Sequence, residues 1–211
     1  MLIYFPAHFT GDVVYFIWKN SLAKIKAAGL SIGKHGGRIR PNQDAMCVKK
    51  NGLYVVADGV SGSADGRAAS QIAVKTLIEK CTGPVPDPDV LLDAIMLANE
   101  RVCAIDTVTK YYSFSATTIT VVWLNKNDIR APYIGAHLGD SFCFDINMCN
   151  MLATWLKTAQ HNDEDGRITH YLGMPSLTRN QVDTFEGKMR VGARLLLCTD
   201  GMQQAFFHSG W

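Results

Sequence analysis

Val55-Val56-Ala57-Asp58-Gly59-Val60-Ser61-Gly62 is the stretch of sequence that decides the fold of this chain. Its apolar half begins at Leu53 and has the length and composition of a short buried strand. Asp58 and Gly59 then form a turn pair, because aspartate and glycine both favour tight turns for local reasons. The stretch therefore predicts a strand that ends in a carboxylate at the edge of a sheet.

Helical and β patterns follow this stretch in separate blocks. Residues 66–81 carry apolar side chains at helical spacing, and a second helix is predicted after the proline-rich break at 84–88, with Asp89 as its N-terminal cap. In the second half of the chain, strands are predicted at 117–124, 131–138, 141–146 and 194–198. Two helices between strand-rich halves favour an α+β fold in which sheets pack together.

Composition limits the class of protein. The chain has 211 residues, enough for one domain with some extra sequence. Hydrophobic residues make up 47% and charged residues 19%, which excludes a disordered chain. The 21 basic and 19 acidic residues are scattered, so no basic stripe indicates a nucleic-acid partner.

The sequence also favours a cytoplasmic protein without a membrane partner. No segment reaches the length of uncharged apolar sequence that indicates a membrane-spanning helix. The apolar start of the chain lacks a basic region and carries Asp12, so it does not predict a signal peptide. The six cysteines form no Cys-x-x-Cys motif and are typical of small buried side chains in a reducing compartment.

Four aspartates beside predicted strands carry the chemistry that the sequence suggests. Asp58, Asp140 and Asp200 follow strands, each next to a glycine or serine, and Asp44 precedes a strand. Any one of them alone is typical of a turn. Together, carboxylates at neighbouring strand ends converge on one edge of a sheet, where they repel each other unless cations lie between them. Oxygen ligands of this kind suit Mg²⁺ or Mn²⁺.

Five motifs contain or accompany these aspartates and occur in one order along the chain. They are Arg40-Pro41-Asn42-Gln43-Asp44-Ala45, Val55 to Gly62 as quoted above, Gly66-Arg67-Ala68-Ala69-Ser70, Ala136-His137-Leu138-Gly139-Asp140-Ser141 and Leu196-Leu197-Cys198-Thr199-Asp200-Gly201. In order and spacing they resemble the bacterial branch of the PP2C family, the metal-dependent protein Ser/Thr phosphatases. The resemblance covers residues 29–204 and includes a lesser match at Ser115-Ala116-Thr117-Thr118.

The resemblance implies an α+β fold, a β-sandwich of two antiparallel sheets flanked by helix pairs, here shortened at its C-terminus. The phosphatase domain would span residues 29–211, and residues 1–28 would form an N-terminal extension that packs on it. This extension holds two segments rich in strand formers, at 2–5 and 13–18, although residues 13–28 fit a helix equally well.

The resemblance also implies a centre of two Mn²⁺ or Mg²⁺ ions with a third, weaker ion. Asp58 would bridge the first two ions, and the Gly59 carbonyl would bind one of them. Asp44 and Asp200 would hold the second ion, and Asp140 together with Asp200 would hold the third. A hydroxide shared by two divalent ions forms near neutral pH and would attack phosphorus without a protein nucleophile.

An arginine would complete the catalytic site by binding the phosphate oxygens in a bidentate fork. The family places this arginine five residues before the metal-binding aspartate, a position that Ile39 occupies here. Arg40 and Arg38 lie one position to either side, and we expect Arg40 to serve, with Arg38 as the alternative.

The expected activity is hydrolysis of phosphoserine and phosphothreonine in proteins that a Ser/Thr kinase has phosphorylated. The sequence departs from the family in three further ways: Val60 stands where many eukaryotic members have histidine, Phe142 replaces an arginine, and no counterpart of the family's last aspartate or closing strand occurs before Trp211. The last departure predicts weaker binding of the second ion and an open sheet edge, which the N-terminal extension, a second protomer or further chain would cover. It also leaves an alternative function, a pseudophosphatase that binds a phosphoprotein or kinase with little or no turnover.

Three histidines lie close to these motifs, and we expect a structural role for each. His137 is expected to be a packed, hydrogen-bonded residue of a strand. His161 and His170 fall in a polar stretch and are expected to be exposed to solvent.

Overall fold

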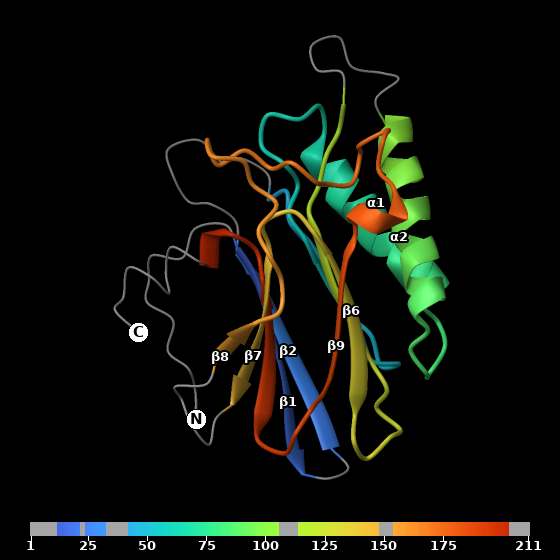
Figure 1. Cartoon of the computed structure of the whole chain (residues 1–211), viewed down its shortest axis with the longest axis vertical. Helices are drawn as coiled ribbons and strands as arrows, with labels where there is room; N and C mark the ends of the chain where they lie inside the picture. Colours follow the sequence, from blue (N-terminus) through green and yellow to red (C-terminus); the bar gives the residue numbers. More distant parts are fainter. Residues whose placement is uncertain (1–11, 22–23, 33–41, 106–113, 148–153, 203–211) are drawn as a thin grey trace.

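Two five-stranded antiparallel sheets form the protein, for which a computed structural model describes residues 12–21, 24–32, 42–105, 114–147 and 154–202 (Figure 1). The strand order is β2-β1-β10-β7-β8 in the first sheet and β3-β4-β5-β6-β9 in the second. The strands of the first sheet are β1 (Asp12–Ser21), β2 (Lys24–Ile32), β7 (Phe142–Asn147), β8 (Thr154–Leu156) and β10 (Ala193–Cys198). Those of the second are β3 (Ala45–Val48), β4 (Leu53–Ala57), β5 (Ile119–Leu124), β6 (Pro132–Leu138) and β9 (Asp183–Lys188).

Alternate side chains of the second sheet pack into two different hydrophobic cores, one between the sheets and one under the helices. Val56 and Val122 face the first sheet and pack with its buried side chains, among them Leu195 and Leu197. Their neighbours face the opposite way, because successive side chains of a strand point to opposite faces. Since both faces are covered, β4 and β5 are buried along their whole length and read as continuous apolar runs.

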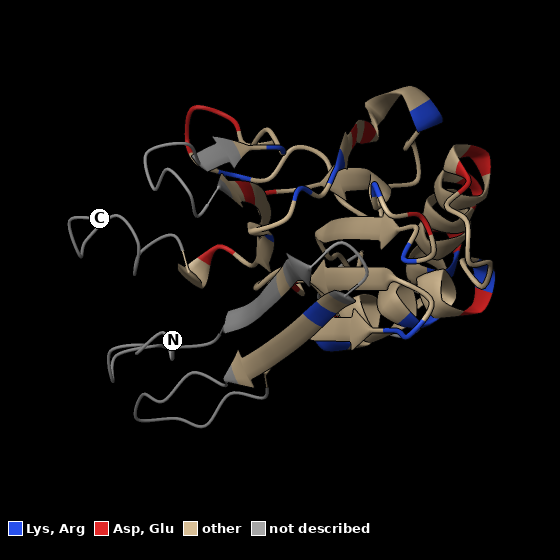
Figure 2. Ribbon diagram, turned by 90° about the horizontal axis from the view of Figure 1, so that it is seen from below, with Lys and Arg blue, Asp and Glu red and all other residues tan. Residues whose placement is uncertain are grey.

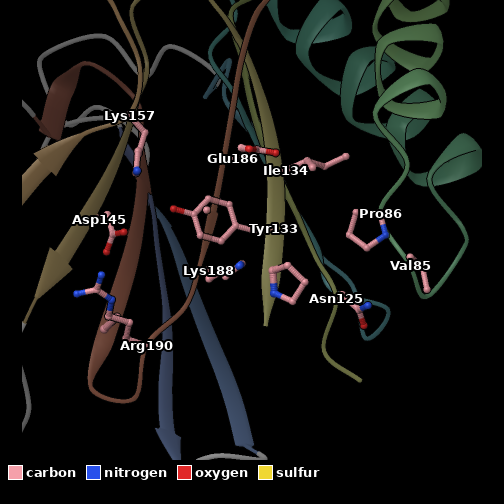
Figure 3. Close-up of a pocket in the computed structure, with 13 residues that line it drawn as sticks. Val85, Pro86, Asn125, Tyr133, Ile134, Asp145, Lys157, Glu186, Lys188 and Arg190 are labelled. Carbon is pink, nitrogen blue, oxygen red and sulfur yellow. The ribbon is translucent and has the colours of Figure 1, made fainter. Parts of the chain in front are cut away.

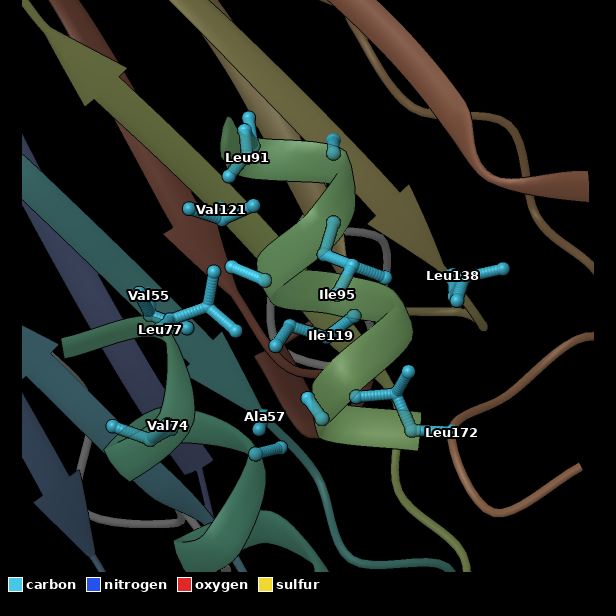
Figure 4. Packing of buried hydrophobic residues seen from close by; sticks show 14 of the residues in the cluster. Val55, Ala57, Val74, Leu77, Leu91, Ile95, Ile119, Val121, Leu138 and Leu172 are labelled. Carbon is cyan, nitrogen blue, oxygen red and sulfur yellow. The ribbon is translucent and has the colours of Figure 1, made fainter. Parts of the chain in front are cut away.

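A pair of helices covers the outer face of the second sheet, α1 (Gly66–Lys80) and α2 (Pro88–Cys103) (Figures 1 and 4). Leu77 of α1 and Ile95 of α2 are fully buried against Val121 of β5. This is the only helix pair in the part of the chain that the structure describes, where a three-residue 3-10 turn at Arg179–Gln181 also occurs. The predicted α+β sandwich is confirmed.

The N-terminal cap of α2 lies two residues before the predicted one. Asp87, and not Asp89, caps the helix: its carboxylate accepts hydrogen bonds from the backbone N–H groups of Asp89 (2.9 Å) and Val90 (3.3 Å). Pro88 at the first helical position explains the difference, because proline lacks the N–H that is unsatisfied there and its φ angle suits the helix.

The N-terminal segment forms a strand hairpin, so the helical alternative for residues 13–28 is wrong. β1 pairs with β10, where Val14 lies opposite Cys198 and Trp18 lies opposite Arg194, and on its other side β1 pairs with β2. The hairpin therefore covers the edge that β10 would otherwise present. The segment at 2–5, which is also rich in strand formers, lies outside the described residues.

Ile17→Ala is expected to show how strongly this hairpin is anchored. The Ile17 side chain is fully buried between the two sheets, and truncating such a residue to alanine costs about 3 kcal/mol in the free energy of unfolding. Urea denaturation measures the change. Leu30→Ala on β2, where the side chain is 46% exposed, is the matched control and should cost far less. Equal losses in the two variants would contradict the described packing.

The sequence patterns miss three strands, β2, β8 and β9. β9 reads Asp-Thr-Phe-Glu-Gly-Lys, with no apolar run and with four of its six residues exposed. It is a strand because it pairs with β6 over six residues, from Pro132 opposite Lys188 to His137 opposite Asp183. Tertiary pairing at a sheet edge thus overrides weak local β propensity.

Positively and negatively charged side chains are spread over strands, loops and helices (Figure 2). None of the helices among the described residues is long and apolar enough to cross a membrane.

Candidate metal centre

Four of the predicted site residues come from strand ends that meet at one end of the sandwich. Asp44 directly precedes β3 and Asp58 directly follows β4, and these two ends are neighbours because Ala45 lies opposite Ala57 in the antiparallel pair. Asp140 lies in the connection from β6 to β7, which carries the chain from the second sheet to the first.

Asp200 reaches the same end from the first sheet. It follows β10, whose last residue Cys198 pairs with Phe142, the residue that begins β7 just after Asp140. Antiparallel register therefore brings all four aspartates to one end of the sandwich, as the sequence predicts for carboxylates at neighbouring strand ends.

The backbone of Asp58 is held on both sides by a pair of threonines. Its N–H donates to the Thr118 hydroxyl (3.0 Å), and its carbonyl accepts from the Thr117 hydroxyl (2.8 Å) and from the backbone N–H of Thr118 (2.8 Å). The Thr118 hydroxyl also lies 2.8 Å from that of Ser141, next to Asp140. The threonines belong to the Ser115 to Thr118 motif, a lesser match whose positioning role the sequence alone did not reveal.

Because Gly59 has no side chain, the start of α1 can lie close to the turn at Asp58. A Cβ atom at position 59 would lie 2.2 Å from the carbonyl oxygen of Gly66 and 2.8 Å from that of Gln43. Gly66 is the first residue of α1, and Gln43 precedes Asp44. The missing side chain thus sets the spacing between two of the aspartates and the start of the helix.

The carboxyl groups of the centre raise one another's pKa values. Burial, and next the nearby charges of Asp44 and Asp200, raise the pKa of Asp58 from 3.8 to about 10. Burial and the charge of Asp200 raise the pKa of Asp140 to about 6. Charges of one sign are therefore concentrated at a partly buried position.

This donor set suits divalent cations. Carboxylate and carbonyl oxygens are the ligands that Mg²⁺ and Mn²⁺ prefer, and a cation between Asp44, Asp58 and Asp200 would remove the repulsion that raises the pKa of Asp58. Within the described ranges, no group of three or more His, Cys, Asp or Glu side chains has the geometry of a metal site. The carboxylates are close enough to interact, and their chemistry fits the ions.

Gly139, immediately before Asp140, is held by two histidines. The His161 imidazole Nδ1 accepts from the Gly139 N–H (3.2 Å), and the backbone N–H of His161 donates to the Gly139 carbonyl (2.9 Å). His137 Nε2 lies 3.0 Å from the same carbonyl. His161 Nε2 in turn lies 3.0 Å from a carboxylate oxygen of Asp183.

The prediction that His161 is exposed to solvent is therefore wrong, and His170 is partly exposed. The side chain of His161 is only 11% exposed. Its ring is tilted against that of His137 and meets that of His170 edge to face, with centroid distances of 5.2 and 4.9 Å. The polar sequence around His161 concealed this role, because its partners come from β6 and β9. The prediction of a packed, hydrogen-bonded His137 is confirmed: its Nδ1 lies 2.8 Å from the buried Thr120 hydroxyl.

His137 is expected to make stability fall in mild acid. Burial, and next the neighbouring His161, lower the pKa of His137 from 6.5 to about 4. The unfolded chain then takes up a proton below about pH 6.5 and the folded chain only near pH 4, so stability is full above pH 6.5 and falls between these values by about 3 kcal/mol. Urea denaturation at pH 7.5 and pH 5 measures the loss, which should shrink in His137→Asn. An equal loss in that variant would show that other groups cause it.

The two arginines predicted to bind phosphate, Arg40 and Arg38, lie outside the described residues. The first described residue of this segment, Asn42, accepts a hydrogen bond from the backbone N–H of Asp44 (2.9 Å). This contact fixes the chain just after the arginines and just before β3.

The fold is similar to those of bacterial Ser/Thr phosphatases. The Mycobacterium tuberculosis serine/threonine phosphatase PstP/Ppp is 21% identical, with a TM-score of 0.64 over 78% of this chain and 74% of that one. The PPM Ser-Thr phosphatase MsPP from Mycobacterium smegmatis, in complex with cacodylate, is 28% identical, with a TM-score of 0.60 over 76% and 73%. The catalytic domain of PstP in complex with 2 manganese ions is 20% identical, with a TM-score of 0.63 over 90% and 78%. Fold and carboxylate cluster together define the class of PP2C-like Ser/Thr phosphatases.

The sequence profile of the family described as Protein phosphatase 2C matches residues 34–210, and the chain belongs to this family. Members of the family are protein Ser/Thr phosphatases that depend on divalent metal ions and act on phosphoproteins. No curated protein matches the chain. The resemblance seen in the five sequence motifs is thereby confirmed.

Proposed function

We propose that this protein is an active phosphatase that hydrolyses phosphoserine and phosphothreonine in proteins, with Mn²⁺ or Mg²⁺ bound at the four aspartates. The single observation that carries the proposal is the convergence of Asp44, Asp58 and Asp200, whose charges together with burial raise the pKa of Asp58 to about 10. With this pKa the Asp58 carboxyl of the metal-free chain keeps its proton at neutral pH, and a divalent cation bound between the carboxyl groups would take the place of that proton.

Each residue of the centre then has a defined task. Asp58 would contact two ions, with the Gly59 carbonyl as a further ligand of one of them, and Asp44 and Asp200 would hold the second ion. Asp140 and Asp200 would hold a third ion more weakly. When bound, divalent ions lower the pKa of water toward neutrality and offset the charge of the phosphate.

The protein's own part is to hold these groups and the substrate in place. Thr117 and Thr118 fix the backbone of Asp58, so its carboxylate does not need to be ordered when substrate arrives. Arg40, or Arg38, would bind two phosphate oxygens in a fork and orient the phosphorus atom.

Hydrolysis of a phosphothreonine peptide by the full chain, with Mn²⁺ titrated from zero, tests the proposal. Turnover that rises with Mn²⁺ and saturates supports it. A folded chain that binds Mn²⁺ and the phosphopeptide without releasing phosphate would instead identify a pseudophosphatase, the alternative function. The phosphoprotein substrate would be one that a Ser/Thr kinase has phosphorylated.

Asp140→Asn is expected to separate the third ion from the first two. Its amide keeps the shape of the side chain and removes one charge from the weaker site only, so tight Mn²⁺ binding should persist while turnover falls roughly tenfold. Calorimetric titration with Mn²⁺ counts the ions bound, and phosphate release measures turnover. Loss of the tight ions in this variant would contradict the assignment of Asp140.

A further inference from the structure

His161 and Asp183 form a side-chain pair beside the candidate metal centre, and the proposed function gives this pair no task. His161 Nε2 lies 3.0 Å from a carboxylate oxygen of Asp183, the first residue of β9. The side chain of Asp183 is 48% exposed, whereas that of His161 is 11% exposed. The pair therefore extends from the surface of the protein to Gly139, the buried residue before Asp140.

Gly139 joins β6 to Asp140 in a conformation that favours glycine. Its φ angle is 106°, in the left-handed region, and a Cβ atom at position 139 would lie 2.6 Å from Cγ2 of Thr118. Glycine also has more backbone freedom than any other residue. The orientation of Asp140 therefore depends on contacts that restrain Gly139.

His161 restrains both peptide groups of this glycine. The Gly139 N–H belongs to the peptide group shared with Leu138, and its carbonyl belongs to the one shared with Asp140. The His161 ring accepts from the N–H at Nδ1 (3.2 Å), and the His161 backbone N–H donates to the carbonyl (2.9 Å). Because each peptide group is planar, these two contacts fix both backbone dihedral angles of Gly139, and with them the direction in which the chain enters Asp140.

The partners of the His161 ring assign the position of its proton. The Gly139 N–H can only donate, so Nδ1 carries no proton and accepts. The neutral imidazole then carries its proton on Nε2, which donates it to the Asp183 carboxylate. Asp183 therefore stabilises the one tautomer that can hold Gly139.

The two neighbouring histidines have different contacts. His137 Nε2 lies 3.0 Å from the Gly139 carbonyl, so it restrains only that side of the glycine. The His170 ring meets that of His161 edge to face, and its Nδ1 lies 3.1 Å from the Thr169 hydroxyl. In the part of the chain that the structure describes, the acceptor for the Gly139 N–H is the ring of His161.

We propose that His161, oriented by Asp183, is a positioning residue that orders Asp140 for binding of the third, weaker ion. The inference rests on the proposed function, because it assigns the pair to the ion site to which Asp140 belongs. Both side chains act through the backbone of Gly139 and do not contact the ion. Removing a partner that orients a metal ligand typically weakens metal binding tenfold or more.

Titration of the full chain with Mg²⁺, followed by NMR at the amide signals of Gly139 and Asp140, measures the weak ion without any turnover. We expect a saturable response in the wild type and a Kd raised about tenfold or more in His161→Ala. In His161→Asn the side-chain oxygen takes the place of Nδ1 and can accept from the Gly139 N–H, so the Kd should stay close to that of the wild type. His170→Asn removes a ring that makes no hydrogen bond to Gly139 and should leave the Kd unchanged.

Melting temperatures in EDTA distinguish positioning from a merely structural role. Both His161 variants lose the packing of the ring, so their melting temperatures should fall alike, while only His161→Ala loses affinity for the weak ion. If loss of packing were the cause, the two variants would bind the ion equally weakly.

Asp183→Ala keeps the test valid if the His161 variants are unstable, because the Asp183 side chain is 48% exposed. Long-range ¹H–¹⁵N spectra of the metal-free chain should show the Nε2–H tautomer of His161 in the wild type and a mixture of tautomers in Asp183→Ala, whose Kd for the weak ion should rise several-fold. Asp183→Asn removes the same charge but keeps an acceptor oxygen, so it should retain both the tautomer and the affinity.

The outcomes separate this inference from the proposed function. Equal affinities in His161→Ala and His161→Asn, an Nδ1–H tautomer in the wild type, or no response of Asp140 to Mg²⁺ would overturn the inference. A wild-type chain that shows the tautomer and the ion response but releases no phosphate would overturn the phosphatase activity and support the inference.

Discussion

Asp58→Asn is expected to abolish metal-dependent phosphate release while making the metal-free chain at least as stable as the wild type. The amide is isosteric with the carboxylate, but it removes the charge at the point where Asp44 and Asp200 converge. Loss of a bridging ligand removes several kcal/mol of transition-state stabilisation, roughly a thousandfold or more in rate. Phosphate release with titrated Mn²⁺ measures the first effect.

Thermal unfolding with and without Mn²⁺ measures the second effect. Mn²⁺ should raise the melting temperature of the wild-type chain, because an ion that binds only the folded state stabilises it. It should leave that of Asp58→Asn unchanged. Asp89→Asn on α2, where the side chain is 89% exposed, is the matched control and should behave like the wild type in both assays. Wild-type turnover in Asp58→Asn would show that the metal centre lies elsewhere.

Gly59→Ala is expected to cost about 3 kcal/mol in the free energy of unfolding. The new Cβ would lie 2.2 Å and 2.8 Å from two backbone carbonyl oxygens, those of Gly66 and Gln43, which cannot rotate away as a side chain can. Either α1 or the segment before β3 must move, so Mn²⁺ affinity should fall together with stability.

Urea denaturation and calorimetric Mn²⁺ titration measure both losses. Gly83→Ala is the control, because its Cβ would meet nothing closer than 3.6 Å, an ordinary contact. If Gly59→Ala kept wild-type stability, the close approach of α1 to the Asp58 turn would be refuted.

Strands with continuous apolar sequence were predictable, and strands without it were not. β4 was predicted at its observed bounds, and β10 differs from the predicted 194–198 by one residue, because burial on both faces requires apolar side chains throughout. β9 has no such requirement, since most of its residues are exposed, and only its pairing with β6 makes it a strand.

The candidate site shows the same division. The four aspartates could be found because each stands beside a strand end in a recognisable motif. His161 could not, because its contact with Gly139 joins residues 22 positions apart through two elements that the local sequence does not connect. Nor could the interaction of Tyr133 on β6 with Asp145 on β7 (Figure 3), because these strands belong to different sheets.

The sequence by itself determined the buried strands, the two helices, the family and the identity of the carboxylates, since all of these depend on local pattern and residue chemistry. Only the tertiary structure decided that the N-terminal segment is a hairpin on β10 and that two histidines hold Gly139. The physical reason is that side-chain periodicity extends over a few residues, whereas strand order and register follow from packing between segments far apart in the chain.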